Sequence, residues 1–147
     1  MAFTGTIRPL APSDRAAWDG LCAGYLTFYE TSAAPEVSET TWRRLLDPAE
    51  PMFALVAEDE GGVFGLVQCV LHASTWAVEP FCYLNDLFVD PARRGTGTGR
   101  ALIEAVYAEA DVRGAARVYW LTHETNATAR LLYDRLARRT GFIQYRR

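Results

Sequence analysis

A turn with three alternating glycines is the part of the sequence whose residue types and spacing most resemble a chemical site. Its members are Arg94, Gly95, Thr96, Gly97, Thr98, Gly99 and Arg100. A helix that begins in such a turn directs its unpaired N–H groups and the positive end of its dipole at one place, which suits a phosphate. A Cβ there would hold a phosphate away from the backbone. The segment therefore predicts a pyrophosphate-binding turn, with a purely structural strand-to-helix turn as the alternative.

Two familiar glycine-rich motifs do not describe this turn. A Walker A loop ends in Gly-Lys-Ser/Thr, whereas Gly99 is followed by Arg100 and Ala101. A dinucleotide-binding turn has the spacing G-x-G-x-x-G and usually follows the first strand, whereas this turn has G-x-G-x-G and follows the fourth expected strand. A nucleotide-binding enzyme is therefore a distant possibility.

The elements that must position the turn follow from apolar periodicity and from turn residues. Strands are expected over residues 6–10, 52–58, 63–73, 81–89, 117–121 and 142–145. Helices are expected from Ser13 as N-cap to about Tyr29, over 39–46, over 97–113, and from the capping Asn126 to Leu136. The order β-α-α-β-β-β-α-β-α-β predicts an α/β fold in a single domain spanning residues 1–147. Its mixed sheet would carry helices on both faces.

Two motifs in this order resemble the GNAT superfamily of N-acetyltransferases. The turn matches the pyrophosphate motif Q/R-x-x-G-x-G/A, with Arg94 at its first position. After the next expected strand, the stretch from Asn126 to Tyr133, followed by Gly141 and Phe142, is similar to N-x-x-A-x-x-L-Y…G-F of the same superfamily. The resemblance covers nearly the whole chain and implies the GNAT fold and an acetyl-CoA-dependent transfer to an amine.

A closer likeness is carried by residues 82–89 and 118–126. These segments resemble the yeast acetyltransferases that modify polyamines and histone tails, with relatives that act on D-amino acids. The Tyr-Leu-x-Asp core from Tyr83 to Asp86 is also similar to diamine N-acetyltransferases. Those enzymes carry glutamate where this chain has Asn85, so the likeness supplies no general base at that position.

The family resemblance assigns coenzyme contacts to three segments. Strand residues Leu87, Phe88 and Val89 would separate from the neighbouring strand and pair with the pantetheine arm, and the Val89 N–H would polarise the thioester carbonyl. Backbone groups of Gly95 to Arg100 would bind the pyrophosphate. Asn126 is expected to cap its helix, with a coenzyme contact as a secondary role.

Proton transfer is assigned to two residues. Tyr133 matches the family's general acid, which protonates the departing thiolate; a core tyrosine on the apolar stripe of its helix is the alternative. Asp86, an acid inside an apolar strand, is the best candidate for the base that deprotonates the amine. A carboxylate satisfied by backbone groups or an arginine is the equally open alternative, and Glu30, Glu79 and Glu124 are weaker candidates.

The acceptor site is expected at the first two helices and their loop. Aromatic and acidic side chains there suit an alkylammonium group, although a helix packing its aromatics into the core beside solvated glutamates explains them as well. Tyr29, Glu30 and Asn85 are the predicted acceptor contacts. Strand alternation places Asn85 and Asp86 on opposite faces, so that only one of them would line the pocket.

Composition narrows the function further. The chain has 147 residues, a formal charge of −3 and a sequence pI near 5.4, which does not favour nucleic acid. Three cysteines without CxxC spacing and only two histidines predict reduced thiols and no metal site.

No apolar run approaches the length of a membrane span, so a cytoplasmic protein is expected. A homodimer paired through the last strand is expected from relatives, and a non-catalytic acyl-CoA sensor is the main alternative function.

Overall fold

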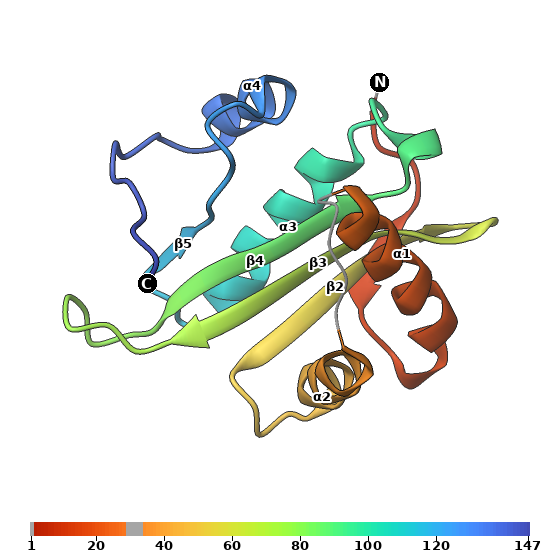
Figure 1. The fold of residues 1–147 in the computed structure, drawn as a ribbon, viewed down its shortest axis with the longest axis horizontal. Coiled ribbons are helices and arrows are strands. Elements are labelled where there is room, and N and C mark those ends of the chain that lie inside the picture. The colour runs from red at the N-terminus through yellow and green to blue at the C-terminus, as the bar shows by residue number, and fades with distance from the viewer. Residues whose placement is uncertain (1, 29–33) are drawn as a thin grey trace.

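A five-stranded mixed sheet organises the chain, and the computed structural model describes residues 2–28 and 34–147 of it (Figure 1). The strand order is β1-β2-β3-β4-β5, antiparallel from β1 to β4 and parallel between β4 and β5. The strands are β1 Thr6–Pro9, β2 Met52–Asp59, β3 Gly62–His72, β4 Phe81–Val89 and β5 Arg117–Tyr119. The predicted α/β class and strand order are confirmed as far as β5.

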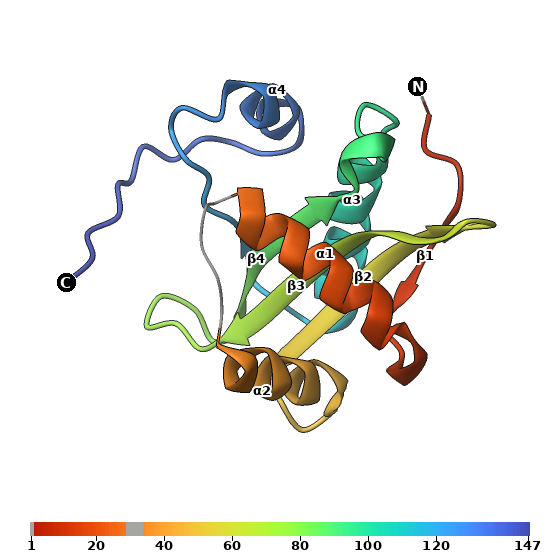
Figure 2. The same ribbon diagram turned by 45° about the vertical axis from the view of Figure 1, so that its right-hand side comes forward.

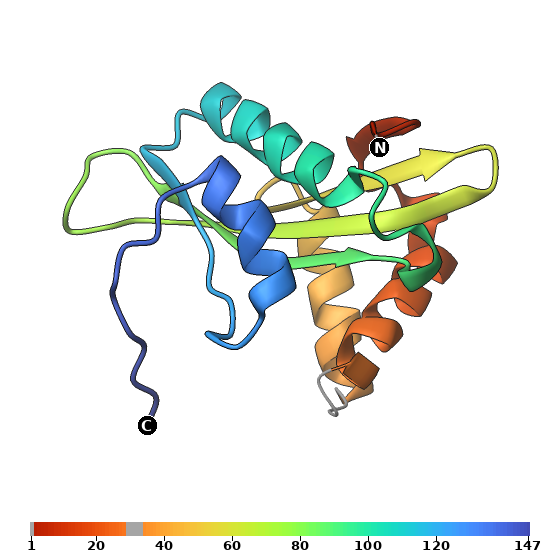
Figure 3. The same cartoon turned by 90° about the horizontal axis from the view of Figure 1, so that it is seen from above.

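Helices cover both faces of this sheet. They are α1 Arg15–Phe28, α2 Pro35–Leu46, α3 Thr98–Val112 and α4 Ala127–Leu136, with 3-10 turns η1 Pro12–Asp14 and η2 Pro91–Arg93. Figure 3 shows α3 on one side of the sheet and α1 and α2 on the other. Helix α4 follows β5 and lies toward the β4 end of the sheet.

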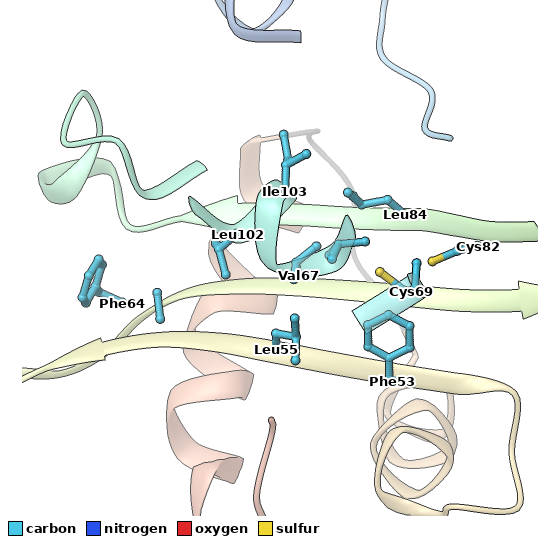
Figure 4. Packing of buried hydrophobic residues seen from close by; sticks show 12 residues of the cluster. Phe53, Leu55, Phe64, Val67, Cys69, Cys82, Leu84, Leu102 and Ile103 are labelled. Carbon is cyan, nitrogen blue, oxygen red and sulfur yellow. The ribbon is translucent and has the colours of Figure 1, made fainter. Parts of the chain in front are cut away.

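Two apolar clusters hold these layers together. On the α3 face, Leu102, Ile103 and Val106 are fully buried against sheet residues that include Val67 and Cys69 (Figure 4). On the other face, the rings of Trp18 on α1 and Trp42 on α2 pack 5.3 Å apart, within a second cluster. Trp42 is therefore a core residue, which agrees with the alternative that aromatic side chains of the first two helices pack into the core. All three cysteines are free thiols.

The start of α1 is held by an acid instead of the predicted Ser13 cap. Ser13 lies inside the 3-10 turn η1, and the next residue, Asp14, accepts the Ala11 N–H at 2.8 Å. Arg8 of β1 donates two further bonds to Asp14, at 2.7 and 2.9 Å, and also bonds Glu58 of β2. These bonds lower the pKa of the Asp14 carboxyl well below its usual value, since the Arg8 guanidinium stabilises the charged form.

Helix α2 begins four residues before the predicted Glu39. Pro35, which the sequence interpretation placed in a loop, occupies the first turn of the helix. Proline is well suited to that position because its missing N–H would have no intrahelical partner and its φ is already helical.

The predicted last strand over residues 142–145 is not formed. Phe142, Ile143 and Tyr145 are 92%, 76% and 89% exposed, and the segment after α4 runs outward from the sheet (Figure 2). A strand needs a neighbouring edge to satisfy its backbone groups, and within the described residues no strand pairs with this segment. The segment is rich in aromatic and β-branched residues, which favour a strand, but it lacks a partner.

The first turn of α3 approaches the sheet closely at Gly65 of β3. A Cβ built on Gly65 would lie 3.2 Å from side-chain carbons of Thr98 and Leu102 on α3 and of Ala57 on β2. Thr98 is 2% exposed, so the start of α3 has no free space into which to move. The lack of a side chain at Gly65 therefore lets the helix N-terminus sit directly on the strand.

We predict that Gly65→Ala lowers the free energy of unfolding by about 1–3 kcal/mol, the usual cost of overpacking. The added methyl group must displace Thr98 and Leu102. Gly20→Ala on α1 is the matched control, because a Cβ there meets nothing within 4 Å and alanine favours the helix. Urea unfolding monitored by circular dichroism measures both variants; equal stability of Gly65→Ala and wild type would contradict the close approach.

Candidate functional site

The predicted phosphate-binding turn has two glycines in the left-handed region. Gly95 has φ +76° and Gly97 has φ +80°, and Gly97 is the residue immediately before α3. The first helical N–H to find an intrahelical acceptor is that of Ala101, which bonds the Gly97 carbonyl at 3.0 Å. The preceding N–H groups therefore lie at the helix N-terminus, where a bound anion can accept them.

Side-chain contacts hold this turn against the sheet. The guanidinium of Arg93 forms an ion pair with Asp59 of β2 and lies 4.0 Å from the centre of the Phe64 ring. The Thr96 hydroxyl donates to the Arg93 carbonyl at 2.6 Å and bonds the Thr98 hydroxyl at 2.9 Å. Arg93 therefore anchors the turn to the sheet.

The turn fits a pyrophosphate. A Cβ built at Gly95 meets nothing within 4 Å, so open space lies in front of the backbone on that side. Arg94 and Arg100 are exposed beside it, and Arg100 also pairs with Glu104 one helical turn later. Left-handed glycines, a helix N-terminus and nearby arginines are together the residue set that a diphosphate needs.

Strand β4 loses its partner on one side before it reaches the turn. β5 pairs with Phe81, Cys82 and Tyr83 only, whereas β3 pairs with β4 as far as Val89. The Asp90 N–H bonds the Phe64 carbonyl of β3 at 2.9 Å, so Gly65 and Val89 form a non-hydrogen-bonded pair. The Val89 N–H therefore points away from β3, toward the opening between β4 and β5.

An open groove of about 610 Å³ lies on the α1 side of the same region. Its walls come from α1, from the end of β4 and from the turn, and include Gly24, Phe88, Asp90 and Arg94. A Cβ on Gly24 would come within 3.0 Å of the Phe88 ring. Two predicted coenzyme contacts, Phe88 and Arg94, thus share one groove, and the Arg94 guanidinium lies 5.7 Å from the centre of the Phe88 ring.

Helix α4 brings the predicted acid, Tyr133, toward the turn. Leu132 on this helix lies 3.5 Å from the position of a Cβ on Gly99, so α4 contacts the start of α3. Tyr133 is partly buried, and its ring meets the Trp120 ring edge to face at 5.4 Å. The Tyr107 hydroxyl on α3 donates to the Leu136 carbonyl at 2.9 Å and fixes the end of α4.

Asn126 occupies the position before α4 but does not cap it with its side chain. The side-chain amide donates to the Thr122 hydroxyl at 3.3 Å, and the Asn126 backbone carbonyl accepts the Arg130 N–H at 3.1 Å. Asn126 is thus the N-cap residue, as predicted, but its side chain makes no capping hydrogen bond.

Asp86 lies on the α1 side of β4, in a partly buried polar contact. The β3–β4 register shifts between Gln68 and Cys69, which leaves Asn85 as an extra residue and pairs Asp86 with Gln68. The Gln68 amide donates to Asp86 at 2.9 Å. Burial raises the pKa of the Asp86 carboxyl, while hydrogen bonds from the Gln68 and Asn85 side chains oppose this rise.

The bulge changes the predicted relation between Asn85 and Asp86. Simple alternation placed them on opposite faces, but the extra residue interrupts alternation, and the Asn85 side chain hydrogen-bonds Asp86. Asn85 is exposed. Among the described residues no arginine pairs with Asp86, so its partners are amides and not a cation.

An aromatic surface continues from Asp86 along the same face. The rings of Tyr83 and Tyr119 stack 5.0 Å apart, and Tyr119 bonds the His72 Nε2 at 2.7 Å. All three side chains are partly exposed. The predicted acceptor contacts Tyr29 and Glu30 lie outside the described residues.

Comparison with known proteins identifies the family. Residues 16–137 match the model of the acetyltransferase (GNAT) family. The chain belongs to the GNAT acetyltransferases. It is 38% identical over 143 residues to the D-amino-acid N-acetyltransferase HPA3 of Saccharomyces cerevisiae, covering 96% of this chain and 89% of that protein. It is also 32% identical to the uncharacterized N-acetyltransferase YhfO of Bacillus subtilis, covering 95% and 94% of the two chains.

Solved structures support the GNAT fold. An aminoglycoside acetyltransferase from an uncultured soil metagenomic sample superposes with a TM-score of 0.79 at 20% identity, covering 97% of this chain and 95% of that one. AAC(6')-Iy, in complex with a coenzyme A bisubstrate analogue, also gives a TM-score of 0.79 at 20% identity, covering 98% and 99%. This chain thus has both the sequence and the fold of a GNAT acetyltransferase.

Sequence reasoning missed two polar contacts of this GNAT site. Gln68 bonds both Asp86 and the indole of Trp18, and Tyr119 pairs with His72. The available signal for Gln68 was a lone amide within the apolar strand from Val63 to Leu71.

In the described ranges 2–28 and 34–147, no helix has both the length and the apolarity needed to cross a bilayer, and no three His, Cys, Asp or Glu side chains gather as a metal site.

We predict that Gly97→Asp abolishes acetyl-CoA binding in isothermal titration calorimetry. The new carboxylate would occupy the space in front of the α3 N-terminus and repel a phosphate. A residue with a Cβ in the left-handed region also costs about 1–2 kcal/mol of stability.

Gly114→Asp separates these two effects. Gly114 follows the other end of α3 with φ +72°, so it carries the same strain and the same added charge away from the turn. We expect it to lose stability but to keep acetyl-CoA affinity. Wild-type affinity in Gly97→Asp would refute the phosphate assignment.

Proposed function

We propose that this GNAT enzyme transfers the acetyl group of acetyl-CoA directly to a primary amine. The acceptor would be a polyamine, a lysine of a basic peptide, or an amino acid. The observation that carries the proposal is that β5 pairs with β4 only as far as Tyr83. The rest of β4 is therefore open on that side; it leads into the glycine turn and carries a partly buried carboxylate, Asp86. A D-amino acid is included because the yeast relative HPA3 is named for that acceptor.

The coenzyme would lie along the open edge of β4. Backbone groups of Leu87 and Val89 face the opening and are available to pair with an amide-containing arm, while the turn from Gly95 to Arg100 takes the diphosphate. Acetyl-CoA, when bound, supplies the acetyl thioester. The Val89 N–H then donates to the carbonyl oxygen, where negative charge develops in the transition state.

Asp86 and Tyr133 move the protons of this reaction. Asp86 takes one proton from the substrate ammonium and releases it to solvent. The freed amine forms the new N–C bond as the C–S bond breaks, and Tyr133 gives a proton to the departing sulfur. The nitrogen then loses its second proton. This proton replaces the one that Tyr133 gave to the sulfur, so the tyrosine returns to its starting state. One proton is released per turnover.

The acceptor would approach from the α1 face. Asp86 provides a negative charge there, and the stacked Tyr83 and Tyr119 rings provide a π surface suited to a cationic or apolar body. Asn85, exposed beside Asp86, is positioned to contact the acceptor. Tyr29 and Glu30 remain proposed acceptor contacts on sequence grounds.

The enzyme would act in the cytoplasm as a homodimer, with residues 1–147 forming one catalytic domain. Exposed Phe142, Ile143 and Tyr145 support a dimer, because a second copy would cover apolar side chains that this chain leaves in water. Strand β5 is the edge of the sheet and pairs on one side only, so it offers an edge to a partner.

The function is tested by release of the coenzyme A thiol from acetyl-CoA across one acceptor panel. The panel holds spermidine and spermine, basic histone-tail peptides, D- and L-amino acids, and aminoglycosides, with the Gly97→Asp variant as the negative control. We expect turnover on one amine class. Tight acetyl-CoA binding with silence on every acceptor would favour a non-catalytic acyl-CoA sensor and overturn the proposal.

Tyr133→Phe tests the proposed acid. We predict that kcat falls by about 10²-fold, the usual contribution of a general acid, while acetyl-CoA affinity is retained. Tyr107→Phe is the matched control on the neighbouring helix. It loses the bond to the Leu136 carbonyl, which costs about 1 kcal/mol of stability, and keeps its turnover. Full kcat in Tyr133→Phe would mean that another group supplies the proton.

A further inference from the structure

A hydrogen-bond chain connects helix α1 to Asp86 through strand β3. The Trp18 indole N–H donates to the side-chain oxygen of Gln68 at 2.7 Å, and the Gln68 side-chain nitrogen donates to Asp86 at 2.9 Å. Trp18 is 3% exposed and Gln68 is 9% exposed, so water does not compete freely for either bond. The chain joins three elements, and its two bonds lie on the α1 face.

The direction of the Gln68 amide is decided by Trp18. An indole N–H can only donate, so the group that faces it must be the amide oxygen. The amide nitrogen then has to face Asp86, and a primary amide nitrogen can only donate. Trp18 therefore forces Gln68 to present a donor to the carboxylate, which favours the ionised form of Asp86.

Strand register places Asp86 opposite Gln68. This pair is the last of a regular antiparallel ladder that starts at Gly65 and Val89, and Trp18 lies on the same face. The bulge at Asn85 follows directly, so the extra residue adds its amide beside the carboxylate.

Apart from Gln68, the groups that face Asp86 are the Asn85 amide at the bulge and two titratable side chains. From α1 comes the Cys22 thiol, whose pKa is raised to about 12 by burial and, to a lesser degree, by Asp86 and Asp19. On β4 itself, the Tyr83 hydroxyl also has a raised pKa, from burial and from Asp86. Both groups are neutral near pH 7, so they add no charge that would hold the carboxylate.

We propose that Trp18 and Gln68 are positioning residues that keep Asp86 ionised and oriented as the base of the acetyl transfer. The inference rests on the proposed function. Gln68 holds one carboxylate oxygen by its N–H, and the Asn85 amide also hydrogen-bonds the carboxylate. An ionised carboxylate has about four acceptor sites, so these two bonds leave others to take the ammonium proton. Trp18 acts one step further away by preventing the amide from turning its oxygen toward Asp86.

The test is a direct titration of Asp86 by ¹³C NMR in coenzyme-free protein, with the resonance assigned by its loss in Asp86→Asn. Gln68→Met keeps the length of the side chain and removes the donor, so we expect the Asp86 pKa to rise by about one unit or more. Trp18→Phe keeps an aromatic ring but frees the amide to turn, so we expect a smaller rise in the same direction. Trp76→Phe, at a residue 89% exposed on the β3–β4 loop, and Gln144→Met, in the exposed C-terminal segment, are matched controls.

The pH dependence of kcat/KM distinguishes positioning from mere structural support. A higher Asp86 pKa keeps the carboxyl protonated to a higher pH, so the acidic limb of the profile must move up by the same amount as the NMR pKa. Raising the pH should restore activity in both variants, which a packing defect would not allow. Trp18→Phe provides the measurement if Gln68→Met fails to fold.

Two results would overturn the inference. An unchanged Asp86 pKa in the Gln68 and Trp18 variants would show that the amide does not control the carboxylate. A raised pKa without a matching shift of the acidic limb would show that Asp86 is not the base. In that case the coenzyme and Tyr133 parts of the proposed function would stand, because acetyl-CoA binding and the Tyr133→Phe result do not depend on Asp86.

Discussion

Strand β4 is paired along its full length by β3 but only over Phe81 to Tyr83 by β5, and the rest of the structure is arranged around that difference. A strand inside a sheet has its backbone groups satisfied on both sides, whereas the last part of β4 keeps one row of donors and acceptors available. The Val89 N–H belongs to this row. The opening is therefore a surface made of backbone groups, and the proposed coenzyme pairing there would depend little on particular side chains.

The turn after β4 has to be rigid for such a backbone site to work. Arg93 ties it to Asp59 and Phe64 on the sheet, and the absence of a side chain at Gly65 lets the first turn of α3 sit directly on β3. From the other side, Leu132 brings α4 against Gly99. The donors at the start of α3 are thus fixed before any ligand arrives, and donors that are already fixed can bind an anion without a cost for ordering them.

The two faces of the sheet have different chemical roles. The α3 face is an apolar core that supports the turn, with Leu102 and Ile103 fully buried. The α1 face holds the polar chain from Trp18 through Gln68 to Asp86, and then the stacked Tyr83 and Tyr119. In the proposed reaction the coenzyme uses the opening between β4 and β5, whereas the amine uses the α1 face, so the two substrates meet across the same strand.

The sequence by itself determined the element order, the glycine turn and the family, because hydrophobic periodicity and the two motifs are local properties of the chain. It also placed Tyr133 on a helix that follows β5, although its nearness to the turn comes from the packing of Leu132 on Gly99. Only the tertiary structure decided the partners of Asp86, because the bulge at Asn85 breaks the alternation from which the faces were predicted. Tertiary packing also decided the place of Trp42, which lies in the core against Trp18. It likewise decided that residues 142–145 form no strand, because no strand among the described residues pairs with them. Local pattern fixes what a segment can form, but contacts between distant segments decide which donors meet which acceptors.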